Sequence, residues 1–426
     1  MRWYRIFSSL LFILFCIFTS QPETAAAQLA QLQAGVAKLN ITPQIPVPMY
    51  GYGNRKDNLQ GIHDSLYVRT LLFSDGHQTV AMIATDICEY QQDFSDYALP
   101  RIADETGIPE DHLMFTATHT HGGPVISLNE KQPEHVRTNS EWTLNQIIQC
   151  VQDAKANLQP ARMGQGTGEA WVAMNRRARS ADGEIVLGVN PTGPVDRSVG
   201  VIRVDALDGT PIAAGINFAV HGTVMSGKNY QITGDLPGIA EQYVEKTIGH
   251  GVIAPFYNGC SGDNNPIYHN VERFGTKIGE ATILGQILGE EVVRVYNNVT
   301  MSDRAIIKAA ADNFEIPGKP YGTFWPVGAD TLSTAKSRKI NLTAFRINGL
   351  VVCSISGEVF GEIGKKIKSQ SPYRNTFVLS LTNGTWYYIP TADEFIKGGY
   401  EIKSSINTPE GEGIILDRMQ RLLESL

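Results

Sequence analysis

Residues 113–124 have the sequence LMFTATHTHGGP, an apolar run that ends in two histidines and a Gly-Gly-Pro turn. If the run is a β-strand, alternate side chains share a face, so His119 and His121 point into one cavity at its end. Neutral imidazole is the commonest metal ligand in proteins, so this spacing fits a metal site. Two surface histidines, or one packed and one solvated, fit it as well. No helical His-Glu-x-x-His zinc motif occurs in the sequence.

The start of the chain has the composition of a targeting segment. Two arginines precede the apolar run 10–18, and three alanines end at Ala27. This is the order of a secretory signal peptide, and its apolar run is too short to span a bilayer. We therefore predict a signal peptide at residues 1–27 and one catalytic domain at residues 28–426. The protein is then exported, either secreted or periplasmic, without a transmembrane anchor after cleavage.

Charge and cysteine content exclude some classes of function. The formal net charge is −7, and no basic run or basic-aromatic stripe occurs, which argues against nucleic acid as a partner. Beyond the leader the cysteines are far apart and form no Cys-x-x-Cys pair, which argues against a cysteine-based zinc site. They are Cys88, Cys150, Cys260 and Cys353, and export leaves open whether any of them pair.

Short β-rich runs alternate with helical periodicity along the chain. We predict hairpins from residues 66–73 with 79–85 and from residues 342–347 with 350–356, the second across Asn348-Gly349. Residues 33–46 predict a strand followed by a turn at Thr42-Pro43. Further strands are predicted at residues 199–205, 212–220, 252–256 and 377–382, and helices at residues 94–106, 140–158, 234–246, 276–295 and 411–426. Residues 170–197 are rich in Gly, Arg, Asn and Pro and predict an irregular loop. No repeat or composition break appears, so the sequence predicts a mixed α/β (α+β) fold, a single large domain of mixed β-sheets flanked by helices.

Polar side chains directly follow many of these short β runs. Strand ends that meet at one rim can assemble a site from residues distant in sequence, although strand ends are also exposed and therefore commonly polar. The residues in such positions are Asp86, His119, His121, His221, Asp263, Glu358 and Tyr388.

Several motifs, taken in order, resemble those of the neutral/alkaline (non-lysosomal) ceramidase family. They are ATHTHGGP at 117–124, Asn175-Arg176, NFAVH at 217–221, Gly234-Asp235, SGEVF at 356–360 and YIPTADEF at 388–395. The resemblance extends from about residue 34 to residue 405. This combination in this order is improbable by chance.

The resemblance implies a Zn²⁺ ion held by His119, His221, Glu358 and Tyr388. It also implies that His121 lies beside these ligands and that Arg176 lies near the substrate oxygen. Two imidazoles, a carboxylate and a phenolate are suitable zinc ligands and leave room for a water. Such an ion lowers the pKa of water to ~7 and polarises an amide carbonyl. The implied function is zinc-dependent hydrolysis of the N-acyl amide of ceramide or a related N-acyl lipid.

The sequence departs from the family pattern at the proposed nucleophile. Members carry Gly-Asp-x-Ser-Pro, whereas residues 262–266 read GDNNP, so Asp263 is retained but Asn265 replaces the serine. Ser261 is nearby, but it precedes Asp263 by two residues, so its side chain is expected to point in a different direction from that of the family serine. Either water activated by the metal attacks directly, with Asn265 orienting it or donating to the oxyanion, or the activity is altered or lost. Gly122 stands where the family has serine, and we expect it to open space beside the metal.

Other features leave the substrate open. The chain ends where the family's C-terminal immunoglobulin-like domain would begin, so any docking or metal site that depends on that domain is expected to be absent. Alternatives are a hydrolase of another exported N-acyl amide or ester, and a non-catalytic lipid- or ligand-binding homologue that lost the serine. An N-acyl lipid substrate would allow peripheral membrane contact. Candidate walls of an acyl pocket, if they are not plain core residues, are Trp171, Phe324, Trp325, Trp386 and Tyr387.

Overall fold

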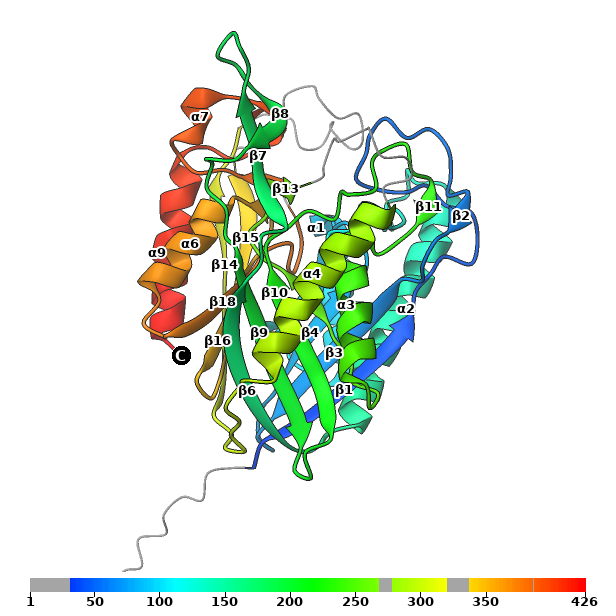
Figure 1. The fold of residues 1–426 in the computed structure, drawn as a ribbon, viewed down its shortest axis with the longest axis vertical. Helices are drawn as coiled ribbons and strands as arrows, with labels where there is room; N and C mark the ends of the chain where they lie inside the picture. Colours follow the sequence, from blue (N-terminus) through cyan, green and yellow to red (C-terminus); the bar gives the residue numbers. More distant parts are fainter. Residues whose placement is uncertain (1–30, 268–277, 320–336, 386) are drawn as a thin grey trace, which may run out of the picture.

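The centre of the molecule is a large sheet packed face to face on a smaller one (Figure 1). The computed structural model describes residues 31–267, 278–319, 337–385 and 387–426. In spatial order, the large sheet consists of β12 (Phe256–Asn258), β10 (Pro211–Phe218), β9 (Ser198–Ala206), β6 (Gln159–Glu169), β1 (Gln33–Asn40), β3 (Tyr67–Ser74), β4 (Thr79–Thr85) and β5 (Leu113–Ala117). The smaller sheet consists of β14 (Ile307–Pro317), β15 (Ser337–Ile347), β16 (Leu350–Ile355) and β18 (Asn375–Leu379).

Helices cover the outer faces of both sheets, so the chain forms four layers. The large sheet is covered by α1 (Gln92–Thr106), α2 (Glu134–Ala156), α3 (Asp235–Ile248) and α4 (Ile278–Tyr296). The smaller sheet is covered by α6 (Gly361–Gln370) and α9 (Glu410–Glu424). Short helical segments are η1 (Glu110–His112), α7 (Glu394–Lys397) and α8 (Tyr400–Ser404).

Strand β3 shows why both faces of the large sheet are apolar. Val68 and Leu72 pack toward the helical layer, whereas Leu71 and Phe73 pack toward the smaller sheet. Strands buried on both faces have near-continuous apolar runs, as this one does. The predicted hairpin of β3 with β4 is confirmed, as is the hairpin of β15 with β16. Because β4 pairs with β5 in parallel, the sheet is mixed, and the predicted mixed α/β fold class is confirmed.

Three small sheets lie beyond the ends of the large strands. They are β13 (Asn264–Pro266) with β7 (Ala173–Arg179) and β8 (Ile185–Asn190), β11 (Gln231–Ile232) with β2 (Gly61–Ile62), and β17 (Glu358–Val359) with β19 (Tyr388–Ile389). The predicted irregular loop at 170–197 is therefore wrong, because β7 and β8 pair as an antiparallel hairpin within it. Its arginines are paired by distant carboxylates, which local composition does not reveal: Arg177 contacts Glu394 and Glu401. The strand predicted at 252–256 is displaced to β12.

The predicted signal peptide at residues 1–27 lies outside the described residues. Within the part of the chain that the structure describes, no helix combines the length and apolar character needed to cross a membrane.

Candidate metal centre

His119 lies just beyond the end of β5, in a left-handed conformation with φ of 68°. Such a backbone is uncommon for a residue other than glycine and persists only where surrounding contacts hold it. Here the His119 amide donates to the carbonyl of Ile87 at 3.0 Å, and its Nδ1 lies 2.7 Å from the carbonyl oxygen of Cys88. The prediction that strand alternation places both histidines on one face is therefore wrong, because β5 ends at Ala117 and both histidines follow it. Their rings still approach, with centroids 5.0 Å apart.

His221 follows β10 and is held in the same manner. Its Nδ1 lies 2.9 Å from the carbonyl oxygen of Ser261 and 3.1 Å from that of Asn264. Since a carbonyl can only accept, Nδ1 carries the proton in both His119 and His221. Each ring therefore presents the lone pair of its Nε2 atom, the arrangement in which a histidine binds a metal.

Glu358 lies in β17, and its carboxylate faces both Nε2 atoms. Its Oε2 is 3.5 Å from Nε2 of His119 and 3.2 Å from Nε2 of His221. One ligand atom from each of these residues lies within 4.8 Å of the other two, and all three side chains are buried. We call His119, His221 and Glu358 the His–Glu cluster.

The polar atoms of the His–Glu cluster fit a cation. Nε2 of His119 and Oε2 of Glu358 are buried without a hydrogen-bond partner, which is costly unless a cation or a proton lies between them. Burial raises the pKa of Glu358, but interactions with His119 and His221 outweigh burial and hold it well below its usual value. Burial, followed by the charge of Arg176, lowers the pKa of His221 to about 3. At neutral pH the cluster thus contains a carboxylate and a neutral His221 imidazole, which suit a zinc-like ion.

Tyr388 is the register partner of Glu358 across the parallel pair of β17 and β19. Its buried ring lies edge-on to the ring of Tyr400, and the two ring centroids are 5.7 Å apart. The guanidinium carbon of Arg176 lies 5.4 Å from the centroid of the Tyr388 ring. Burial, then the charge of Glu358, raises the pKa of Tyr388 well above its usual value. The strand pairing places Tyr388 next to the His–Glu cluster, and its role as a fourth ligand stays a prediction.

Arg176 on β7 lies between the His–Glu cluster and Asn265, the residue that replaces the serine of the family motif. Its Nε donates to Glu401 at 2.7 Å, and its Nη1 lies 3.0 Å from Nε2 of His221 and 3.1 Å from Oδ1 of Asn265. Its Nη2 is buried without a partner. The structure therefore brings Arg176 and Asn265 to the edge of the His–Glu cluster.

Asp263 forms hydrogen bonds with two separate segments beside the His–Glu cluster. It accepts hydrogen bonds from the side chain of Asn175 at 2.8 Å and from the amide of Gly361 at 2.9 Å, joining β7 to the start of α6. Burial raises its pKa to about 6. The Ser261 hydroxyl accepts from Asn258 at 3.0 Å, while its carbonyl lies against His221. Through these two hydrogen bonds Asp263 positions the segment that carries Asn265.

His121 is buried beside His119, with both ring nitrogens lacking a hydrogen-bond partner. Its ring lies 4.9 Å from that of Tyr52 and 5.8 Å from that of His221. Burial, followed by the charges of His119 and His221, lowers the pKa of His121 well below its usual value. The expectation that Gly122 opens space beside the metal is wrong. A Cβ atom at Gly122 would lie 2.3 Å from the carbonyl oxygen of Thr233, so glycine is required there by close packing.

Not every polar strand end belongs to this site. Asp86 at the end of β4 accepts from Arg69 at 3.1 Å, and Arg69 also pairs with Glu241 and Glu245 of α3. These residues form a buried ion cluster, the Arg69 cluster, between the large sheet and α3. Asp86 therefore contributes to packing of the sheet. In the sequence, Asp86 and His221 both follow a short β-rich run, so position alone could not show that only His221 belongs to the site.

The predicted pocket walls are only partly described. Trp171 is 66% exposed, and its ring lies 4.1 Å from the guanidinium carbon of Arg197, so it lines a surface rather than a buried pocket. Tyr387 is half-buried next to Tyr388, and burial raises its pKa to about 12. Phe324, Trp325 and Trp386 lie outside the described residues.

Sequence reasoning missed Glu89, a buried acid near the His–Glu cluster. It accepts from the hydroxyl of Tyr50 at 2.8 Å. Burial, then the charge of Glu358, raises its pKa to about 7. The only sequence signal was its place just after a strand end, three residues beyond Asp86.

Glu89→Gln provides a test of this raised pKa in cation-free protein. Below pH 4.5 Glu89 is protonated in both folded and unfolded chains, so glutamine changes stability little. As pH rises toward 7, the unfolded chain loses the proton first and wild-type stability falls, whereas the variant does not share this loss. We expect the variant to gain up to about 3 kcal/mol relative to wild type between pH 4.5 and 8. Urea unfolding at several pH values measures this; parallel pH profiles for the two proteins would contradict it.

Comparisons with known proteins agree with this architecture. A family model described as neutral/alkaline non-lysosomal ceramidase, N-terminal, matches residues 32–273, more than half of the chain. Neutral ceramidase B of Dictyostelium discoideum is 29% identical over an alignment of 282 residues, and the match covers 59% of this chain and 38% of that protein. A neutral ceramidase of Mycobacterium tuberculosis is 29% identical over an alignment of 245 residues, and the match covers 51% of this chain and 37% of that protein. The chain thus matches well under half the length of these relatives.

A solved structure supports the same fold. The crystal structure of neutral ceramidase from Pseudomonas aeruginosa superposes with a TM-score of 0.77 at 18% identity, covering 93% of this chain and 75% of that one. At this identity the likeness concerns the fold. The family match rests on the sequence model, and it includes the segments that carry His119, His221 and Asn265. The chain belongs to the neutral/alkaline non-lysosomal ceramidase family.

Proposed function

We propose that this chain is an exported, zinc-dependent amidohydrolase that cleaves the N-acyl amide of ceramide or a related N-acyl lipid. The observation that carries the proposal is the convergence of His119, His221 and Glu358, whose ligand atoms lie within 4.8 Å of one another. Family membership supports the choice of an amide substrate. Export rests on the composition of residues 1–27 alone.

His119, His221 and Glu358 would hold the Zn²⁺ ion, with Tyr388 as the fourth ligand. When bound, such an ion polarises a carbonyl and lowers the pKa of water to ~7. The carbonyls of Cys88 and Ser261 keep both imidazoles in the required orientation through their Nδ1 protons. Burial of the carboxylate and both rings excludes bulk water, which strengthens their electrostatic interactions.

Asn265 and Arg176 would act on the substrate carbonyl. Since Oδ1 of Asn265 accepts from Arg176 at 3.1 Å, the amide group is oriented, and its Nδ2 is the atom left to donate. The guanidinium carries a second, unpartnered donor in Nη2. Donors aimed at a developing oxyanion stabilise the transition state. Asparagine has no attacking oxygen, so water is the nucleophile in this proposal.

Asn265→Asp tests the donor role with almost no change of shape. Aspartate can still accept from Arg176 but cannot donate, so kcat is expected to fall roughly 10²–10³-fold, the usual cost of losing one oxyanion donor. Steady-state kinetics measure this, and Asn265→Ser is the matched comparison that restores the family residue. Activity in Asn265→Asp equal to wild type would rule out donation. A serine variant much faster than wild type would indicate that a hydroxyl nucleophile is the missing part.

Substrate class is tested by product analysis on zinc-loaded protein. Ceramide in mixed micelles is compared with a water-soluble N-acyl amino acid and with an ester of the same acyl chain. We expect free fatty acid and sphingoid base from ceramide at the highest kcat/KM. Faster release from the soluble amide or the ester would assign the chain to a different hydrolase. Binding of all three without hydrolysis would favour a non-catalytic binding protein, a reading that the replacement of serine by Asn265 also supports.

A further inference from the structure

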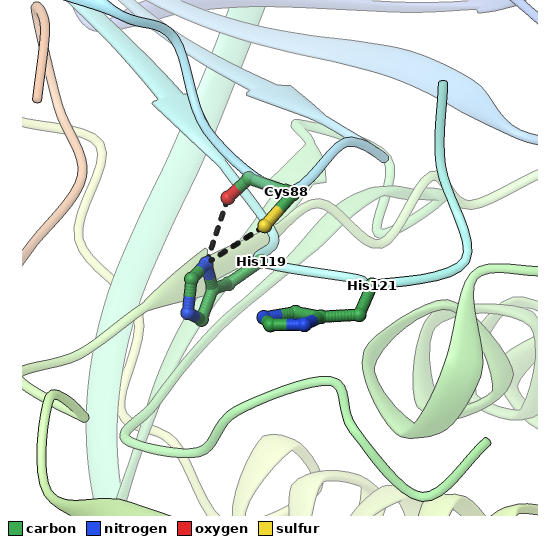
Figure 2. Close-up of side chains that lie close together, drawn as sticks. All are labelled: Cys88, His119 and His121. Atoms are coloured by element: carbon green, nitrogen blue, oxygen red, sulfur yellow. Dashed lines mark hydrogen bonds between the residues drawn. The ribbon is translucent and has the colours of Figure 1, made fainter. Parts of the chain in front are cut away.

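A second group of metal-binding atoms lies next to the His–Glu cluster. One ligand atom each of Cys88, His119 and His121 lies within 4.8 Å of the other two, and all three side chains are buried. Figure 2 shows Cys88 on the chain above His119, with the ring of His121 beside that of His119. We propose that Cys88 and His121 form a second site, for a soft cation with high affinity for sulfur, alongside His119.

His121 provides the first argument, because it is a buried ligand without a partner. Neither of its ring nitrogens makes a hydrogen bond, although only 8% of the residue is exposed to solvent. Its position is set by its backbone, since the carbonyl accepts from Arg55 at 2.7 Å and the amide donates to Gly222 at 2.9 Å. A neutral imidazole held in place with unsatisfied nitrogens loses little entropy when it binds an ion.

Cys88 provides the second argument. Its carbonyl oxygen is the partner of His119 Nδ1, whereas its sulfur makes only a long contact of 3.7 Å with the same nitrogen. The thiol is therefore available, while His119 remains oriented toward the His–Glu cluster through Nε2. The second site therefore takes its ligand atoms from Cys88 and His121, and the ring of His119, whose protonated Nδ1 donates to the Cys88 carbonyl and whose Nε2 faces Glu358, separates the two sites.

The chemistry of the two ligands selects the kind of cation. Thiolate and imidazole together favour soft ions, whereas carboxylate-rich sites favour harder ones. Binding breaks the S–H bond, forms a sulfur–metal bond and releases the thiol proton to solvent. A buried thiol gives up its proton only to an ion that binds sulfur strongly, so Cd²⁺ is a suitable probe. Among the described residues the remaining cysteines, Cys150, Cys260 and Cys353, belong to no such group.

The test is a Cd²⁺ titration of chelator-treated protein, followed by the ultraviolet absorption of the sulfur–cadmium charge-transfer transition. We expect this band in wild type, its loss in Cys88→Ser, and at least tenfold weaker Cd²⁺ binding in His121→Ala. Cys150→Ser is the matched control: that cysteine is buried in α2, its thiol donates to the carbonyl of Val68 at 3.6 Å, and its replacement should keep the band. Circular dichroism verifies that each variant is folded.

His221→Ala separates this proposal from the proposed function. This variant removes a ligand of the His–Glu cluster but none of the second site, so the charge-transfer band should persist. A band that persists in Cys88→Ser, that is absent from wild type, or that disappears with His221 would overturn the second site. Wild-type protein that shows the band yet hydrolyses no amide would contradict the proposed function and leave the second site standing.

Discussion

Replacing His221 with alanine should abolish both zinc retention and hydrolysis. The ring supplies one of three buried ligand atoms within 4.8 Å of one another, and its Nε2 lies 3.2 Å from Oε2 of Glu358. Losing an ion that contributes several kcal/mol to the transition state lowers kcat by about 10³-fold or more. Zinc content after dialysis and kcat on the preferred N-acyl substrate measure the two effects together.

The control for His221→Ala is His77→Ala. His77 lies exposed in the turn between β3 and β4, so its removal should change neither zinc content nor kcat. His119→Ala should reproduce the effect of His221→Ala, since both rings face Glu358. A folded His221→Ala protein that retained one zinc and normal turnover would exclude the His–Glu cluster as the catalytic centre.

Replacing Arg69 with methionine should give the largest loss of stability. Arg69 is fully buried on β3 and pairs with Asp86, Glu241 and Glu245, which join the large sheet to α3. Removing one partner of a buried ion pair leaves uncompensated charge and costs about 3–5 kcal/mol. Urea unfolding followed by circular dichroism measures the change in the free energy of unfolding.

The matched control is Arg101→Met on the surface of α1. Arg101 also pairs with two carboxylates, Glu105 and Glu141, but all three side chains are partly exposed. Exposed pairs contribute about 0–1 kcal/mol, so this variant should unfold near the wild-type midpoint. The cost of Arg69→Met should also shrink at acidic pH, because burial raises the pKa of Asp86 and protonated acids need no cationic partner. Equal effects of the two substitutions at pH 7 would show that the Arg69 cluster does not stabilise the fold.

Much of the architecture could be predicted from local sequence. Two β-rich runs separated by the turn residues 74–77 indicated the hairpin of β3 and β4, and helical periodicity located α2, although its observed start lies several residues earlier. Binary patterns of this kind persist because each element must bury one face or both. The ordered motifs around His119, His221 and Glu358 were sufficient to identify the family that the sequence model then matched.

Other parts of the site depended on contacts between distant segments. Arg176 lies in a region whose composition indicated a loop, but it is part of β7, which pairs with β8 and β13. Its guanidinium also pairs with Glu401 at 2.7 Å. Glu89 carried no motif, and its pKa of about 7 arises from burial and from Glu358, 269 positions away. The close packing of Gly122 against Thr233 is likewise a tertiary contact.

Local sequence thus determined which segments form strands and helices and which side chains carry suitable chemistry, because propensity and periodicity act over a few neighbouring residues. Tertiary structure decided which of those side chains meet. Asp86 and His221 both follow β-strands, yet one is buried in the Arg69 cluster and the other faces Glu358. Burial and charge at each point depend on what packs there from elsewhere in the chain, so partners and pKa values appear only once the sheets and helices are in place.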